Sequence, residues 1–106
     1  MTRVSREVIA QIPVSVFQRS STPALLLLIA PSLQTRYTCV VSKKVARSAV
    51  ARNRLKRWYR EALRKTPLPA RTLLVVHIRT HPRTFEECTA NLHAALQKAF
   101  GIASMP

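Results

Sequence analysis

A basic segment in the middle of the chain, residues 42–61, combines cations with apolar side chains at the spacing of an α-helix. Eight of its twenty residues are Lys or Arg. On a helical wheel at about 100° per residue, one narrow apolar stripe is formed by Ala51, Leu55, Trp58, Tyr59 and Ala62. The opposite side carries Asn53, Arg57, Arg60 and Arg64, with Lys56 beside them and Arg52 and Arg54 on the flanks. A helix with this pattern has to bury its stripe against a core while it exposes its cations.

The whole chain has the same bias toward positive charge. It holds 18 Lys and Arg against 4 Asp and Glu, which gives a formal net charge of +14 on 106 residues and a pI near 11.7. Repulsion on this scale opposes a compact state unless an anionic partner neutralises it, and the candidate partners are nucleic acid and anionic membrane. Charges that only solubilise a protein would mix both signs.

Length and composition predict a single domain, residues 1–106, with a modest core, since 47% of the residues are hydrophobic. Cys39 and Cys88 have neither the number nor the spacing of a disulfide framework or a zinc site, and we expect both to be reduced core residues. The only long apolar run, residues 24–30, is too short to span a bilayer. We therefore expect a cytoplasmic protein without a membrane partner.

The first half of the chain predicts a helix and two strands. Apolar residues at helical spacing predict an opening helix over residues 3–12, which Pro13 ends or kinks. Strands are predicted over residues 24–30 and 36–42, with a turn at 32–35 between them. We expect these two strands to pair as a hairpin.

The second half predicts the basic helix, a strand and a closing helix. Ser48 is the expected N-cap of the basic helix, which should end before Pro67. A continuous apolar strand follows over residues 72–79. Thr84 and Glu87 have the spacing of a capping box, and they precede an apolar stripe of Phe85, Cys88, Leu92, Ala95, Leu96 and Ala99. This order predicts an α+β fold, an α-β sandwich in which helices pack on a small mixed sheet.

A family resemblance comes from the basic segment and its surroundings. The sequence runs Ser42-Lys43-Lys44, then Ala49-Val50, Arg52-Asn53-Arg54, Lys56-Arg57 and Arg60-Glu61. This succession resembles the signature of the bacterial ribonuclease P protein component, and the close resemblance covers about residues 36–64. It implies a small RNA-binding protein that assists a large catalytic RNA in removing the 5′ leader from precursor tRNA. The fold it implies is ribosomal protein S5 domain 2-like, with a left-handed β-α-β crossover through the basic helix, although the usual rule favours the opposite hand.

The predicted RNA-binding residues lie on the basic helix and just before it. Guanidinium groups bind phosphates bidentately, and phosphate contacts position a partner without encoding its sequence. In the family, the Arg-Asn-Arg helix contacts the catalytic RNA. The predicted set is Lys43, Lys44, Arg47, Arg52, Asn53, Arg54, Lys56, Arg57, Arg60 and Arg64.

Leader binding in the family uses aromatic side chains in a cleft between the opening helix and the sheet. Phe17 is the main candidate for this role, and Tyr37 is a second one that fits a core position at least as well. Family members commonly carry a further Phe where this chain has Pro13, and glycines where it has Thr38 and Ala46. These departures concern leader binding more than RNA binding in general.

The sequence shows no catalytic constellation of protein side chains. His77, His81 and His93 are scattered, and no Cys or His spacing suits a metal. The resemblance implies magnesium-dependent phosphodiester hydrolysis in which Mg²⁺ is bound mainly by the catalytic RNA. The expected partners are that RNA and precursor tRNA with its 5′ leader, with no obligatory protein partner.

Three other functions fit the positive charge. A structural ribosomal-type protein would bind rRNA through the same helix without any role toward a substrate. A DNA-binding helix module would place the basic helix in a major groove, but Trp58 and Tyr59 anchor that helix to a core and no dimerisation element follows. A membrane-surface role fits least, because the apolar stripe is needed for the core.

Overall fold

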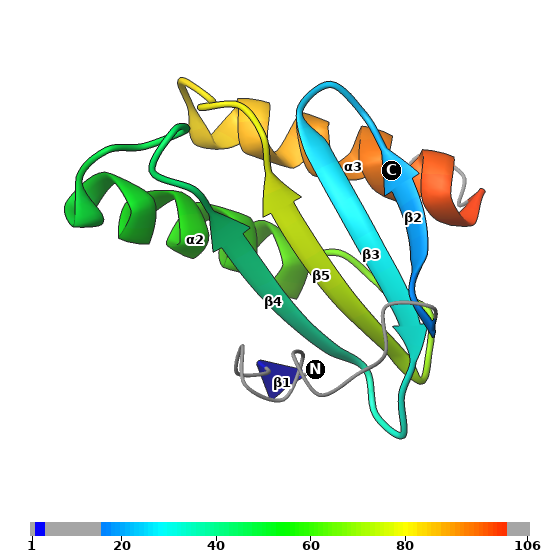
Figure 1. Ribbon diagram of the computed structural model, residues 1–106. Coiled ribbons are helices and arrows are strands. Elements are labelled where there is room, and N and C mark those ends of the chain that lie inside the picture. Colours follow the sequence, from blue (N-terminus) through cyan, green and yellow to red (C-terminus); the bar gives the residue numbers. More distant parts are fainter. Residues whose placement is uncertain (1, 4–15, 102–106) are drawn as a thin grey trace.

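The described part of the chain, residues 2–3 and 16–101 of a computed structural model, consists of a five-stranded mixed sheet and two helices (Figure 1). The strands are β1 (Thr2–Arg3), β2 (Gln18–Ser21), β3 (Leu25–Pro31), β4 (Arg36–Val41) and β5 (Thr72–Ile78), and the helices are α2 (Ala49–Arg64) and α3 (Phe85–Phe100). The sheet order is β1-β4-β5-β3-β2. The predicted opening helix lies outside the described residues, apart from Arg3, which belongs to β1.

Strand β5 occupies the centre of the sheet. It pairs in parallel with β4 and antiparallel with β3, so that Val76 stands between Cys39 and Leu27. The predicted hairpin between residues 24–30 and 36–42 is therefore wrong, although both strands form. Six of the seven residues of β5 are buried. A strand that is apolar on both faces is best covered in the middle of a sheet, and a β3-β4 hairpin would have left it at an edge.

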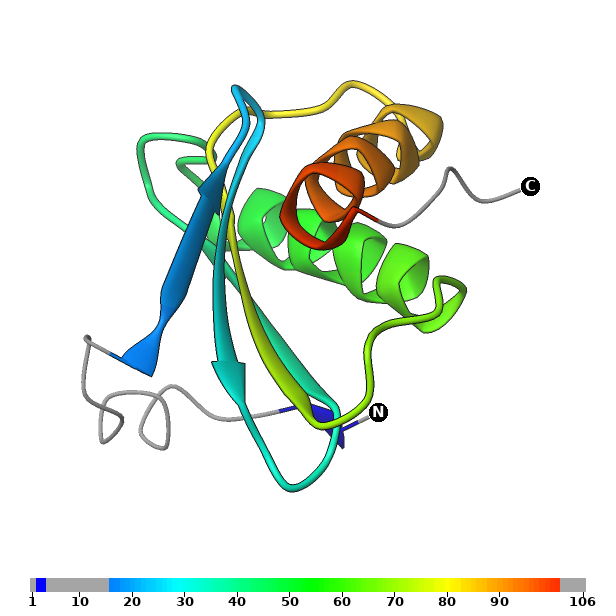
Figure 2. The same ribbon diagram turned by 90° about the vertical axis from the view of Figure 1, so that its right-hand side faces the viewer.

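The connection from β4 through α2 to β5 is a left-handed crossover. Both helices cover the same face of the sheet, which is the rear face in Figure 1, and the side view of Figure 2 shows them together on one side. When β4 and β5 are viewed pointing upward with α2 behind the sheet, β5 lies to the right of β4. This hand is the one that the family resemblance implied, and it is the exception to the usual rule.

The main core lies between the two helices and the sheet. It takes Leu55, Tyr59 and Leu63 from α2, Cys88, Leu92 and Leu96 from α3, and Leu25, Leu27, Leu74 and Val76 from the strands. The predicted stripe of α2 is confirmed at three positions that are buried, while Ala51 and Trp58 are only partly buried. Leu63 joins the core without having been part of the predicted stripe. Both cysteines are buried and form no disulfide, as expected.

Local hydrogen bonds explain where the helices begin and end. The Ser48 hydroxyl accepts a hydrogen bond from the Ala51 N–H at 3.0 Å, and the Thr84 hydroxyl accepts one from the Glu87 N–H at 3.1 Å, so both predicted N-caps are confirmed. Helix α3 ends at Gly101, whose φ of 64° is the left-handed conformation that glycine adopts without strain. No helix in the described ranges is long and apolar enough to cross a lipid bilayer.

Candidate nucleic-acid interface

Helix α2 exposes a line of cations on the side that faces away from the core. We call this surface the cationic ridge, and it consists of Lys56, Arg57, Arg60 and Arg64 together with the neutral amide of Asn53. Three of these residues are exposed, and Lys56 and Arg60 are half-buried. Because Leu55, Tyr59 and Leu63 hold the other side of α2 against the sheet and α3, the ridge is fixed in orientation. Rigid presentation of this kind lowers the entropic cost of binding an extended anionic surface.

The loop between β4 and α2 extends the positive surface beyond the start of the helix. Lys43, Lys44 and Arg47 are exposed in this loop. Arg52 lies on α2 but its guanidinium Nη1 donates to two loop carbonyls, those of Ala46 at 3.0 Å and Arg47 at 2.7 Å. Arg52 therefore fixes the loop against the helix, a structural role that the sequence prediction of an RNA contact did not include.

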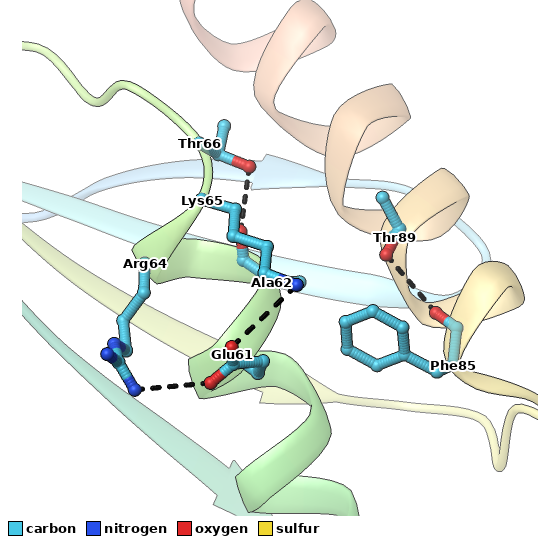
Figure 3. Close-up of polar contacts among 7 residues, drawn as sticks. All are labelled: Glu61, Ala62, Arg64, Lys65, Thr66, Phe85 and Thr89. Carbon is cyan, nitrogen blue, oxygen red and sulfur yellow. Dashed lines mark hydrogen bonds and ion pairs between the residues drawn. The ribbon is translucent and has the colours of Figure 1, made fainter.

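Charge at the end of α2 is partly compensated within the chain. The Glu61 carboxylate contacts Arg64 Nη1 at 3.2 Å and Lys65 Nζ at 3.8 Å (Figure 3). The Arg64, Lys65 and Glu61 side chains are 69%, 67% and 42% exposed, so these surface pairs contribute little stability. Within residues 16–101 these two ion pairs are the ones the structure contains. Arg57, in the middle of the ridge, therefore has its full charge available to a partner.

Arg54 on α2 and Lys65, the C-cap residue of α2, lie over aromatic rings. The Arg54 guanidinium carbon is 5.8 Å from the centre of the Trp58 ring, and Lys65 Nζ is 5.6 Å from the centre of the Phe85 ring at the start of α3 (Figure 3). Neither pair was predicted from the sequence. The i, i+4 spacing of Arg54 and Trp58 was the available signal for the first, whereas the second joins two helices and had no local signal.

The two aromatic candidates for leader binding lie on opposite faces of the sheet. Phe17 is partly exposed and packs against Ala30 and Leu73 on the face that the helices leave uncovered. Tyr37 is only 7% exposed and belongs to the core beneath the helices. The structure therefore contradicts Tyr37 as a leader-cleft residue and supports its alternative core assignment, because a buried ring offers no face for stacking.

Two buried titratable groups, Tyr59 and Cys88, have raised pKa values and stay protonated near neutral pH. The Tyr59 hydroxyl accepts a hydrogen bond from Asn91 Nδ2 at 3.4 Å, and burial raises its pKa well above the ordinary value. Burial also raises the pKa of the Cys88 thiol to about 11, so this group stays protonated and unreactive. Over residues 16–101, no group of three or more His, Cys, Asp or Glu side chains is arranged to hold a metal ion. The described surface is equipped to bind anions.

Comparison with known families agrees with this surface. The model of the family described as Ribonuclease P matches residues 5–100, almost the whole chain. The chain belongs to the ribonuclease P family. Curated ribonuclease P protein components with similar sequences include that of Marinomonas sp. (strain MWYL1), 40% identical over 67 residues, and that of Thermus scotoductus, 43% identical over 70 residues. These matches cover 63% and 65% of this chain but only 50% and 43% of the relatives, so the chain aligns with about half of their length.

Solved structures of ribonuclease P proteins share the fold. The protein of Staphylococcus aureus superposes with a TM-score of 0.79 at 21% sequence identity, over 92% of this chain and 94% of that one. The protein of Thermotoga maritima gives a TM-score of 0.74 at 22% identity, over 90% and 94% of the two chains. The predicted α+β sandwich is therefore confirmed for this chain, and it is the fold of these solved ribonuclease P proteins.

Proposed function

We propose that this chain is the protein subunit of ribonuclease P, which binds a catalytic RNA and precursor tRNA and assists removal of the 5′ leader. The observation that carries this proposal is the cationic ridge of α2, rigidly held by a core in a member of the ribonuclease P family. The ridge would contact phosphates of the catalytic RNA. Arg57 and Arg60 lie at its centre, and the exposed loop residues Lys43, Lys44 and Arg47 would widen the contact.

The face of the sheet opposite the helices is the proposed binding surface for the leader, which would bind at the two ends of this face because Val75 in its middle is buried. Phe17 lies at one end of this face, beside the start of β5. At the other end, where β4 and β5 finish, a cavity of about 370 Å³ is lined by apolar residues of the sheet together with His77, Lys44 and Arg79. An aromatic ring at one end and cations at the other suit a single-stranded RNA, whose bases stack while its phosphates need positive charge.

The catalytic RNA would carry out the hydrolysis of the phosphodiester bond. With no metal-binding group over residues 16–101, we propose that Mg²⁺ is bound mainly by the catalytic RNA and that this chain contributes no catalytic side chain. Its positive charge would replace part of the cation atmosphere that two polyanions need in order to associate. Activity would then depend less on Mg²⁺ when the protein is present, in a cytoplasmic ribonucleoprotein without an obligatory second protein.

Competition binding tests this proposal against the other RNA-binding functions. The measurement is the affinity of the protein for a bacterial ribonuclease P RNA in the presence of excess rRNA or excess duplex DNA at 150 mM salt, where nonspecific contacts are weak. We expect the ribonuclease P RNA to remain bound against both competitors. Displacement by rRNA would favour a structural ribosomal-type protein, and displacement by duplex DNA would favour a DNA-binding module.

A further inference from the structure

One flank of α2 carries a row of side chains that differs from the cationic ridge. Val50, Arg54 and Trp58 follow one another at i, i+4 and i+8, which places them one above the other on the helix surface. We call this row the stacking strip. It lies between the ridge and the buried side of α2, because Trp58 is partly buried and packs against the main core.

The side chains of the stacking strip are accessible to solvent. Val50 is 78% exposed, one of the few large apolar side chains of the described residues that face solvent. Trp58 is only partly buried, and Arg54 is exposed with its guanidinium over the indole. At 5.8 Å from the ring centre, Arg54 is near the outer limit of a cation–π contact, about 6 Å. The indole thus orients the guanidinium while leaving its outer surface open.

The surroundings of the strip favour an uncharged ring over a phosphate. Val50 gives no hydrogen bond to a phosphate and loses exposed apolar area when a flat ring covers it. Toward the end of α2, Glu61 lies three residues after Trp58 and forms ion pairs with Arg64 and Lys65 (Figure 3). These two cations are therefore partly neutralised within the chain and attract a phosphate beside the strip less strongly. Arginine planes and aromatic rings are, moreover, the groups on which unpaired RNA bases stack.

We propose that the stacking strip binds one unpaired nucleobase of the catalytic RNA, which stacks on the Arg54 guanidinium above Trp58 and covers Val50. This inference rests on the proposed function, since it assigns a second mode of contact to the same RNA. The ridge supplies the salt-dependent part of the affinity through phosphates. The strip supplies a part of the affinity that does not depend on salt. This contribution arises only where the RNA presents an unpaired base that can stack on it.

A matched pair of conservative variants separates the two modes. Arg54→Lys keeps the charge of the strip but removes the planar group, and Arg57→Lys makes the same change on the ridge. We expect Arg54→Lys to weaken binding to a bacterial ribonuclease P RNA about tenfold, equivalent to about 1.4 kcal/mol. Arg57→Lys should weaken it less than about threefold, because an ammonium still binds phosphate as a point charge whereas it cannot stack on a base. The slope of affinity against salt should be unchanged in both, because both keep their charge.

Trp58 provides a direct readout because it is the only tryptophan of the chain. A base stacked over the strip should quench its emission when the wild-type protein binds the RNA, and this quenching should be smaller in Arg54→Lys. Thermal unfolding of the two variants should match the wild type, since both positions are exposed. A loss in Arg54→Lys no larger than in Arg57→Lys, or unchanged emission on binding, overturns the inference alone. Failure of the wild type to bind this RNA more tightly than rRNA overturns the proposed function and the inference with it.

Discussion

Removing two charges from the cationic ridge should weaken RNA binding and change its dependence on salt. The perturbation is Arg57→Gln combined with Arg60→Gln. Arg57 is exposed and takes part in neither of the ion pairs of the described residues, and the side chain of Arg60 donates only to the Lys56 carbonyl within its own helix, at 3.3 Å. The substitutions should therefore change the free energy of unfolding by no more than about 0.5 kcal/mol each.

The magnitude follows from counterion release. Each neutralised phosphate contributes about 0.7 to 0.9 to the slope of log affinity against log salt, so two lost contacts should lower that slope by about 1.4 to 1.8. Between 50 and 200 mM salt, the affinity gap between wild type and variant should then shrink by roughly 7- to 12-fold. Filter binding or fluorescence anisotropy with a ribonuclease P RNA at four salt concentrations measures both quantities.

A control with the same charge change tests whether position matters. Arg19→Gln combined with Arg83→Gln also removes two exposed cations, one from β2 and one from the segment before α3. This control should bind with nearly the wild-type slope. If both double variants lose affinity and slope equally, RNA is held by the overall charge of the molecule and the ridge is not a defined interface.

Three further predictions concern the folded chain itself. Ser48→Ala removes the hydroxyl that caps α2 and should lower the free energy of unfolding by about 1 kcal/mol in urea titrations, without altering the salt slope of RNA binding. Leu74→Ala opens a cavity at a fully buried position of the central strand and should cost about 2 to 5 kcal/mol, leaving much of a small domain unfolded at 37 °C. Cys88 has a pKa raised to about 11 from 9.0, so the unfolded chain loses this proton first, and the stability it contributes is intact below pH 9 and lost as pH rises through about 11. Urea titrations at pH 7.5, 9.5 and 10.5 should show a smaller alkaline loss in Cys88→Ala than in the wild type.

Elements with strong local signals were predictable from the sequence. Helices α2 and α3 each combine an apolar stripe with an N-cap hydroxyl, and both signals act within a few residues of the chain. The central strand β5 is a continuous apolar run, which is equally local. Strand β2 had no such signal, because Gln18–Ser21 is polar and mostly exposed and becomes a strand only through its hydrogen bonds to β3.

Strand pairing was not predictable because it is decided by distant parts of the chain. The short turn after β3 suggested a hairpin, yet β5, which begins about thirty residues after the end of β4, takes the place between β3 and β4. The hand of the crossover likewise came only from the family resemblance. The burial of Tyr37 could have been predicted from the sequence. Residues 37, 39 and 41 of a strand share a face, and Cys39 was already expected in the core.

The exposure of the cations could be predicted from the sequence, but their hydrogen bonds and ring contacts within the chain could not. The helical wheel correctly placed Asn53 and Arg57 toward solvent. The hydrogen bonds of Arg52 to the preceding loop depend on where that loop turns, which no periodicity encodes. Whether each of the predicted cations contacts RNA remains a prediction.

Cleavage of a precursor tRNA tests the central proposal most directly. A bacterial ribonuclease P RNA would be incubated with the substrate at a low Mg²⁺ concentration that supports little cleavage by RNA alone, with and without this protein. We predict protein-dependent release of the 5′ leader at the mature tRNA end, and a reduced effect with the Arg57→Gln, Arg60→Gln variant. Binding of the protein to that RNA without any change in cleavage would contradict the account and favour a structural role in which no substrate is recognised.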